Sequence, residues 1–177
     1  MTQRMSREEW RRWSEDHGAR SERVRGEVVA MTPERWAHAR AKANILLAFR
    51  AALAGRPDCV AVPGGMTVEI DDGTDYEPDV AIHCGGPIPD DSVAIPNPVV
   101  VVEVLSPATR HVDTHIKLGD YFRLPSIQHY LLVRADRREV MHYRRDANGS
   151  PALTTVTSGT ITLDPPGVAL CIQDIYG

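Results

Sequence analysis

Lysine is scarce in this chain of 177 residues: among its 20 basic residues only Lys42 and Lys117 are lysines, and all the others are arginines. Arginine is bulkier than lysine and does not readily lose its proton, so it cannot replace a compact ammonium beside a scissile phosphate. The scarcity therefore gives each lysine particular interest.

Long apolar runs and paired cysteines are absent too. No stretch approaches the ~20 apolar residues that cross a bilayer, and the N-terminus lacks the apolar core of a secretory signal. Cys59, Cys84 and Cys171 are odd in number, widely separated and form no Cys-x-x-Cys motif. We expect no membrane partner, a cytoplasmic location, and free thiols rather than disulfides or a zinc site.

The bulk composition predicts one globular domain over residues 1–177, with a core at about 20–145. Its hydrophobic content is 42% and its net charge is −4, which is unlike a general nucleic-acid coat protein. The charge does not exclude a nuclease, because bound divalent cations offset an acidic cluster.

The order of elements predicts a mixed α/β domain. A capping box at Ser6 and Glu9 opens a helix that Gly18 closes. The longest helix is expected from the cap Thr32 to Ala54. Strands are expected at 24–31 (broken at Gly26), 59–62, 66–70, 79–82 and 99–105, a helix at 113–124, and a hairpin at 129–134 and 139–144.

The segment 98–107, PVVVVEVLSP, is the most informative feature of the chain. Its valines predict a strand buried on both faces, and a buried carboxylate such as Glu103 needs a partner, for which a metal ion is the cheapest choice. Asp79 opens another short apolar strand, and Lys117 follows downstream. Two carboxylates on adjacent strands with a nearby lysine outline a metal-dependent phosphodiesterase.

The chemistry that we expect at such a site is hydrolysis assisted by Mg²⁺, with Mn²⁺ as a substitute. Asp79 and Glu103 are suitable hard ligands, and the carbonyl of Val104 is a candidate third ligand. Lys117 would orient or deprotonate water, or stabilise the developing negative charge.

Three motifs, EPD at 77–79, the run 99–107 and Asp113-x3-Lys117-x3-Tyr121, resemble the Uma-two family of predicted restriction endonucleases in the PD-(D/E)xK nuclease superfamily. The resemblance covers roughly residues 5–176. It implies a restriction-endonuclease-like α/β fold, a central mixed β-sheet flanked by α-helices, and a DNA substrate. It also implies metal ligands at Asp79 and Glu103, a supporting acid at Glu27 and a catalytic Lys117.

Two departures accompany the resemblance. The superfamily's usual Glu-x-Lys is here Glu103-Val104-Leu105, and the family typically supplies the lysine from the following helix, where Lys117 lies. The family's Tyr-Glu-Leu-Ile-Asp-Gly-Glu segment resembles residues 21–27, SERVRGE, in which Ser21 and Arg25 differ. The family's helix-start histidine matches His38.

Other interpretations remain open at this point. One alternative is that the chain is a catalytically silent module that keeps the nuclease fold and binds nucleic acid or protein. Another is a zinc hydrolase built on His111 and His115. An arginine cluster would contact phosphates or form a solvated hairpin face: Arg134, Arg137, Arg138, Arg144 and Arg145. Because nucleases of this fold often pair to cut both strands, we predict a two-fold homodimer.

Overall fold

The computed structural model describes residues 4–105 and 116–177, and its centre is a six-stranded sheet of order β10-β9-β8-β7-β6-β3. Strands β7 and β8 are parallel and all other neighbours are antiparallel, so the sheet is mixed, as predicted. The strands are β3 (Cys59–Pro63), β6 (Val80–Cys84), β7 (Pro98–Leu105), β8 (His129–Arg134), β9 (Val140–Arg145) and β10 (Pro151–Val156).

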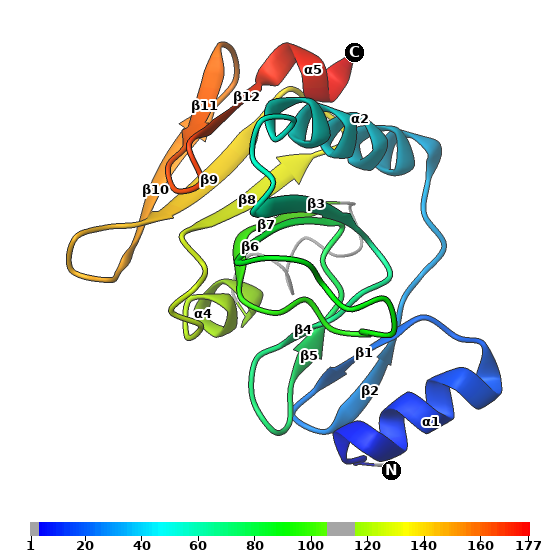
Figure 1. The fold of residues 1–177 in the computed structure, drawn as a ribbon. Helices are drawn as coiled ribbons and strands as arrows, with labels where there is room; N and C mark the ends of the chain where they lie inside the picture. Colours follow the sequence, from blue (N-terminus) through cyan, green and yellow to red (C-terminus); the bar gives the residue numbers. More distant parts are fainter. Residues whose placement is uncertain (1–3, 106–115) are drawn as a thin grey trace.

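Strand β7 is buried on both faces, which explains its continuous run of valines. Val100, Val102 and Val104 pack in a core on the side of helix α2 (Trp36–Ala52). Val101 and Leu105 pack on the opposite side, with the short helix α4 (Leu118–Tyr121). Helices α2 and α4 lie on opposite sides of the sheet (Figure 1). Since side chains alternate along a strand, Glu103 shares the α4 side with Val101 and Leu105.

Helix α2 packs on the sheet through Ala41, Ile45 and Phe49, which share one face at helical spacing. It begins at Trp36, later than predicted, because residues 31–35 run without helical structure and bring Glu34 to Arg20 and Lys42. The Thr32 cap is therefore overridden by tertiary contacts. No helix in the described ranges is long and apolar enough to cross a membrane.

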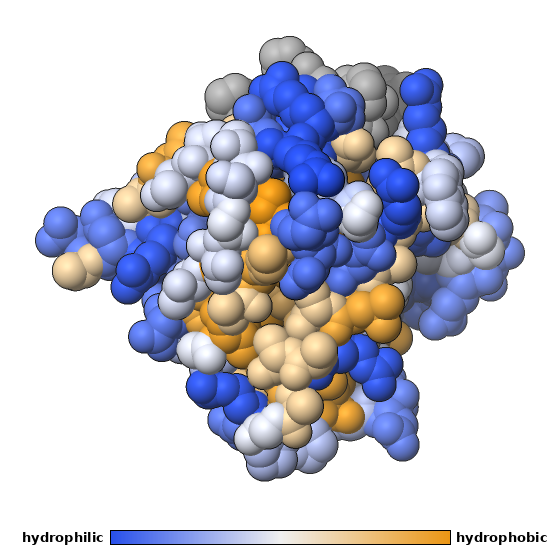
Figure 2. Space-filling model, turned by 90° about the horizontal axis from the view of Figure 1, so that it is seen from above, coloured by the Kyte–Doolittle hydropathy of each residue, from blue (hydrophilic) through white to orange (hydrophobic). Residues whose placement is uncertain are grey.

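The C-terminal segment contributes buried side chains, from Ile161 to Ile175, to the hydrophobic core on the α2 side of the sheet. The hairpin of β11 (Thr160–Leu163) and β12 (Val168–Cys171) and helix α5 (Ile172–Tyr176) pack beside α2. Seen from above, this end of the molecule shows apolar surface among polar side chains (Figure 2).

A four-stranded sheet of order β2-β1-β5-β4 forms the N-terminal part, next to helix α1 (Arg7–His17), whose capping box at Ser6 and C-cap at Gly18 confirm the prediction. The single strand expected over 24–31 is instead a hairpin, because Arg25 (φ 54°) and Gly26 (φ 85°) form a two-residue turn with positive φ. The strands are β1 (Ser21–Val24), β2 (Glu27–Ala30), β4 (Val68–Glu69) and β5 (Asp75–Tyr76).

The prediction of free thiols is wrong for two of the three cysteines. Cys59 and Cys84 are paired positions on β3 and β6, with Cα atoms 4.1 Å apart, and they form a disulfide. Cys171 is free. The 25-residue separation along the sequence gives no sign of this pairing, which arises only when the two strands align.

Candidate active site

The two acids predicted to hold a metal lie at the same end of two neighbouring strands. Val80 on β6 pairs with Val102 on β7, and the next step of this antiparallel register places Asp79 opposite Glu103. The Asp79 amide donates to the Val102 carbonyl at 3.0 Å and fixes this position. The strand pairing therefore brings Asp79 and Glu103 to one edge of the central sheet.

Glu103 has protein partners in its buried position. Its Oε1 accepts hydrogen bonds from Lys117 Nζ and from the Tyr121 hydroxyl, both at 2.9 Å. Lys117, only 3% exposed, also donates to Glu22 Oε1 at 2.8 Å. Burial and the charge of Glu103 raise the pKa of Tyr121 well above its ordinary value, so the phenol remains a neutral donor. We call Glu22, Glu103, Lys117 and Tyr121 the inner cluster.

Glu22, rather than the predicted Glu27, is the acid that β1 contributes to this cluster. Glu22 also accepts the Glu77 amide at 2.9 Å. Glu27 lies across the hairpin turn on β2, and its side chain makes no hydrogen bond or ion pair with the residues that the structure describes. The signal for Glu22 was present in the family resemblance, because Glu22 matches the first glutamate of the family's Tyr-Glu-Leu-Ile-Asp-Gly-Glu segment.

Asp79 is surrounded by cations and donors. Its Oδ2 accepts the Val104 amide at 2.7 Å and lies 3.1 Å from His38 Nε2, while its Oδ1 lies 3.2 Å from Lys42 Nζ. Burial alone would raise the pKa of Asp79, but the hydrogen bond and charge of His38, the charge of Lys42 and the Val104 amide lower it below its usual value. The carboxylate is therefore held in its ionised form.

Lys42 links Asp79 to Glu34, whose Oε1 lies 2.6 Å from Lys42 Nζ. Burial would lower the pKa of Lys42, and the charges and hydrogen bonds of Asp79 and Glu34 raise it. We call Glu34, His38, Lys42 and Asp79 the outer cluster. Sequence reasoning noted the scarcity of lysine but gave Lys42 no role, because its partners come from distant parts of the chain.

Arg20 stands at the rim of the outer cluster. Its guanidinium pairs with Glu77 and lies 3.3 Å from Glu34 Oε1, and its side chain is 48% exposed. Arg20 is more exposed than Lys42 and Lys117, whose side chains are 16% and 4% exposed.

The donor atoms of the outer cluster suit a divalent metal. Ligand atoms of Glu34, His38 and Asp79 lie within 4.8 Å of one another. Carboxylate oxygens and an imidazole nitrogen are ligands that Mn²⁺ accepts, and the carboxylates alone suit Mg²⁺. Val104 enters this region through its amide, and the predicted role of its carbonyl as a metal ligand stays a prediction.

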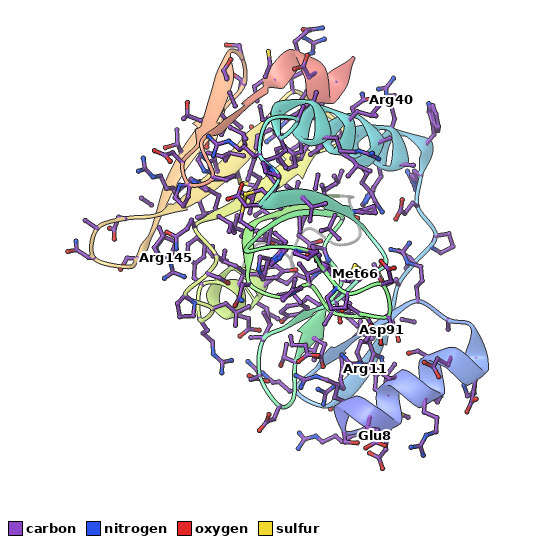
Figure 3. The ribbon with its side chains drawn as sticks, viewed as in Figure 1. Glu8, Arg11, Arg40, Met66, Asp91 and Arg145 are labelled. Carbon is purple, nitrogen blue, oxygen red and sulfur yellow. A yellow bond between two sulfur atoms is a disulfide. The ribbon has the colours of Figure 1, made fainter. Side chains whose placement is uncertain are left out.

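The structure bears on only one of two other predictions from the sequence, the zinc site and the phosphate-binding arginine cluster. His111 and His115, the residues of the zinc interpretation, lie outside the described residues, as does Asp113 of the third family motif. In the arginine cluster, Arg134 pairs with Asp136 at 2.9 Å and Arg137 with Glu139 at 2.6 Å. Arg145 donates to backbone carbonyls that include that of Leu124 (Figure 3). These intramolecular contacts favour a structural hairpin over a phosphate-binding face.

Comparison with known proteins identifies the family of the chain. The sequence profile of the family Uma2, described as "Putative restriction endonuclease", matches residues 7–172. The chain belongs to the Uma2 family. Over 175 residues it is 28% identical to "Uncharacterized protein slr1290" of Synechocystis sp., covering 98% of this chain and 92% of that protein.

A solved structure shares the fold. The crystal structure of "a putative nuclease belonging to DUF820" from Anabaena variabilis superposes with a TM-score of 0.72, covers 90% of each chain and is 15% identical to this protein. The predicted family and the predicted α/β architecture with a central mixed sheet are thus confirmed.

Proposed function

We propose that this Uma2 protein is a metal-dependent endonuclease that hydrolyses phosphodiester bonds of DNA. The observation that supports the proposal is the position of Asp79 and Glu103 at the same end of two neighbouring strands, with Lys117, from a third segment, 2.9 Å from Glu103 Oε1. Buried acids and a buried lysine are costly to maintain for structure alone, and perturbed ionisable groups gather at functional sites.

Mg²⁺, or Mn²⁺ as a substitute, would be held by Asp79 with Glu103, and the donor set of Glu34 and His38 supports binding beside Asp79. When bound, such an ion relieves phosphate charge and lowers the pKa of a coordinated water. Asp79 is suited to this task because its neighbours keep it ionised.

Lys117 acts in this proposal as a charged donor. Its ammonium donates to both Glu22 and Glu103, which fixes its position within the buried cluster. From there it orients water or stabilises the negative charge that develops on the phosphate. The Tyr121 hydroxyl donates to the same oxygen of Glu103 as Lys117 and limits the rotation of that carboxylate.

The proposed activity is tested with the purified chain on circular and linear DNA and on RNA, with Mg²⁺, with Mn²⁺ and with a chelator. We expect DNA cleavage that requires the metal and is lost in Glu103→Ala. Wild-type protein that binds DNA but leaves it intact with either metal would instead identify the catalytically silent module.

We also propose that two copies pair about a two-fold axis to cut both strands of duplex DNA. A domain of 177 residues offers limited surface for a duplex, which favours pairing. Light scattering at micromolar concentrations should give twice the mass of one chain, and a mass of 19.6 kDa throughout would remove this part of the proposal.

A further inference from the structure

Both lysines of the chain lie in the candidate site, although they come from separate elements. Lys117 precedes α4 and joins Glu22 to Glu103, whereas Lys42 lies on α2 and joins Glu34 to Asp79. In each case one ammonium bridges two carboxylates. The proposed chemistry uses Lys117 and leaves Lys42 without a role.

The position of Lys42 is closely defined. Its Nζ lies 2.6 Å from Glu34 Oε1 and 3.2 Å from Asp79 Oδ1, and its side chain is 16% exposed. The backbone of Gly64 forms a wall beside it, since a Cβ at Gly64 would lie 3.4 Å from Lys42 Nζ. Because His38 and the Val104 amide occupy Asp79 Oδ2, Lys42 takes the remaining oxygen of that carboxylate.

The carboxylates that bind Lys42 are the same ones that suit a metal. Glu34 and Asp79 supply two of the three donors that lie within 4.8 Å of one another. An ammonium and a divalent ion at these oxygens would repel each other strongly in a partly buried site. The two cations therefore compete for Asp79, whose Oδ1 is the oxygen that Lys42 contacts.

We propose that Lys42 is a built-in competitor of the divalent ion: its ammonium pairs with Asp79 and Glu34 in the metal-free protein and must leave Asp79 before the ion binds. This inference rests on the proposed function for the use of a metal at Asp79. In this proposal Lys42 sets the affinity of the protein for the metal ion, and it acts through its contact with Asp79.

The test is calorimetric titration of the full chain with Mn²⁺. Lys42→Met removes the competing charge, and we expect it to bind Mn²⁺ at least about tenfold more tightly than wild type. Lys42→Gln, which keeps a hydrogen-bond donor for Glu34, serves as a second neutral variant if Lys42→Met does not fold. Lys42→Arg keeps the charge and should bind Mn²⁺ no more tightly than wild type.

The matched control is Arg40→Met, which removes a positive charge from the exposed side of the same helix (Figure 3). Arg40 makes no ion pair with any residue in the described ranges, so the Mn²⁺ affinity of Arg40→Met should equal that of wild type.

A melting experiment gives a second reading. In chelator, Lys42→Met should melt below wild type because Asp79 and Glu34 lose their cation, and Mn²⁺ should raise its melting temperature more than that of wild type. Equal or weaker Mn²⁺ affinity in both neutral variants, or absence of Mn²⁺ binding in all proteins, would overturn the proposed competition between Lys42 and the ion. DNA cleavage by the wild-type protein tests the proposed function separately. If the neutral Lys42 variants bind Mn²⁺ more tightly but the wild-type protein cleaves no DNA, the Lys42 proposal stands and the nuclease proposal is refuted.

Discussion

The inner and outer clusters have the same arrangement of charges but differ in how far they are exposed to solvent. Each holds one lysine between two carboxylates, but the inner Lys117 side chain is 4% exposed, whereas in the outer cluster that of Lys42 is 16% and that of Glu34 is 23%. A buried ion pair cannot exchange its partner cheaply, and a partly exposed one can. The comparison assigns fixed geometry to the inner cluster and exchange of cations to the outer one.

The largest effect is expected at the inner lysine. Lys117→Ala should lower cleavage by ~10²-fold or more, the scale for losing an acid–base or charge-stabilising group. It should also destabilise the fold by roughly 3–5 kcal/mol, because two buried carboxylates are left without their cation. Cleavage kinetics and urea unfolding measure the two effects.

A double variant separates stability from catalysis. Lys117→Met with Glu22→Gln removes a cation and an anion together and should recover much of the stability, but none of the cleavage. Lys117→Arg should not restore activity, since guanidinium keeps the charge but not the size of ammonium. Wild-type rates in Lys117→Ala or Lys117→Arg would refute the catalytic role.

Glu22 and Glu27 provide a matched pair on neighbouring strands. Glu22→Gln weakens the hold on Lys117 and should lower cleavage by about 10- to 100-fold, the range for residues that orient a functional group. Glu27→Gln should cleave at the wild-type rate, because its side chain is outside the inner cluster. The opposite order would restore the role that the sequence suggested for Glu27.

The residues of the two clusters differ in how far the sequence alone could predict their roles. Asp79, Glu103 and Lys117 were recognisable because each departs from its local pattern: an acid opening or interrupting an apolar strand, and a lysine in an arginine-rich chain. Glu34 and Lys42 sit in ordinary polar segments, so their roles appear only when the approach to α2 and α2 itself meet Asp79. Glu22 had a signal only in the family segment that residues 21–27 resemble. The Cys59–Cys84 pair was hidden for the same reason, because strand alignment creates it.

Lowering the pH should destabilise the central sheet through a buried histidine pair, His129 and His142, and not through the two clusters. His129 Nδ1 lies 2.9 Å from His142 Nε2, and burial lowers the pKa of each to about 4, with the neighbouring charges as a further cause. Because the unfolded chain binds protons at higher pH, this stabilisation is present above about pH 6.5 and is lost as the pH falls towards 4. Each of the two shifts corresponds to about 3 kcal/mol, so the pair should lose several kcal/mol of stability over this range.

Urea unfolding between pH 7 and pH 4.5 measures this loss, and His142→Gln should flatten it. Asp79 remains ionised in this window, since its pKa lies below its usual value. If His142→Gln keeps the full pH dependence, the clusters rather than the histidine pair would be the groups that titrate.

The smallest effect is expected at Glu34, and it tests the comparison most directly. Glu34→Gln removes one partner of Lys42 from a partly exposed pair, and such pairs contribute only about 0.2–1 kcal/mol. Lys42 keeps Asp79 as its partner, so no buried charge is left alone. Glu103→Gln in the inner cluster is the matched change and should cost several times more, because Lys117 and Tyr121 both lose a buried carboxylate. The free energies of unfolding of Glu34→Gln and Glu103→Gln, measured side by side, should therefore differ widely. Equal losses in the two variants would mean that both clusters are rigid and that Lys42 is not free to exchange with a metal.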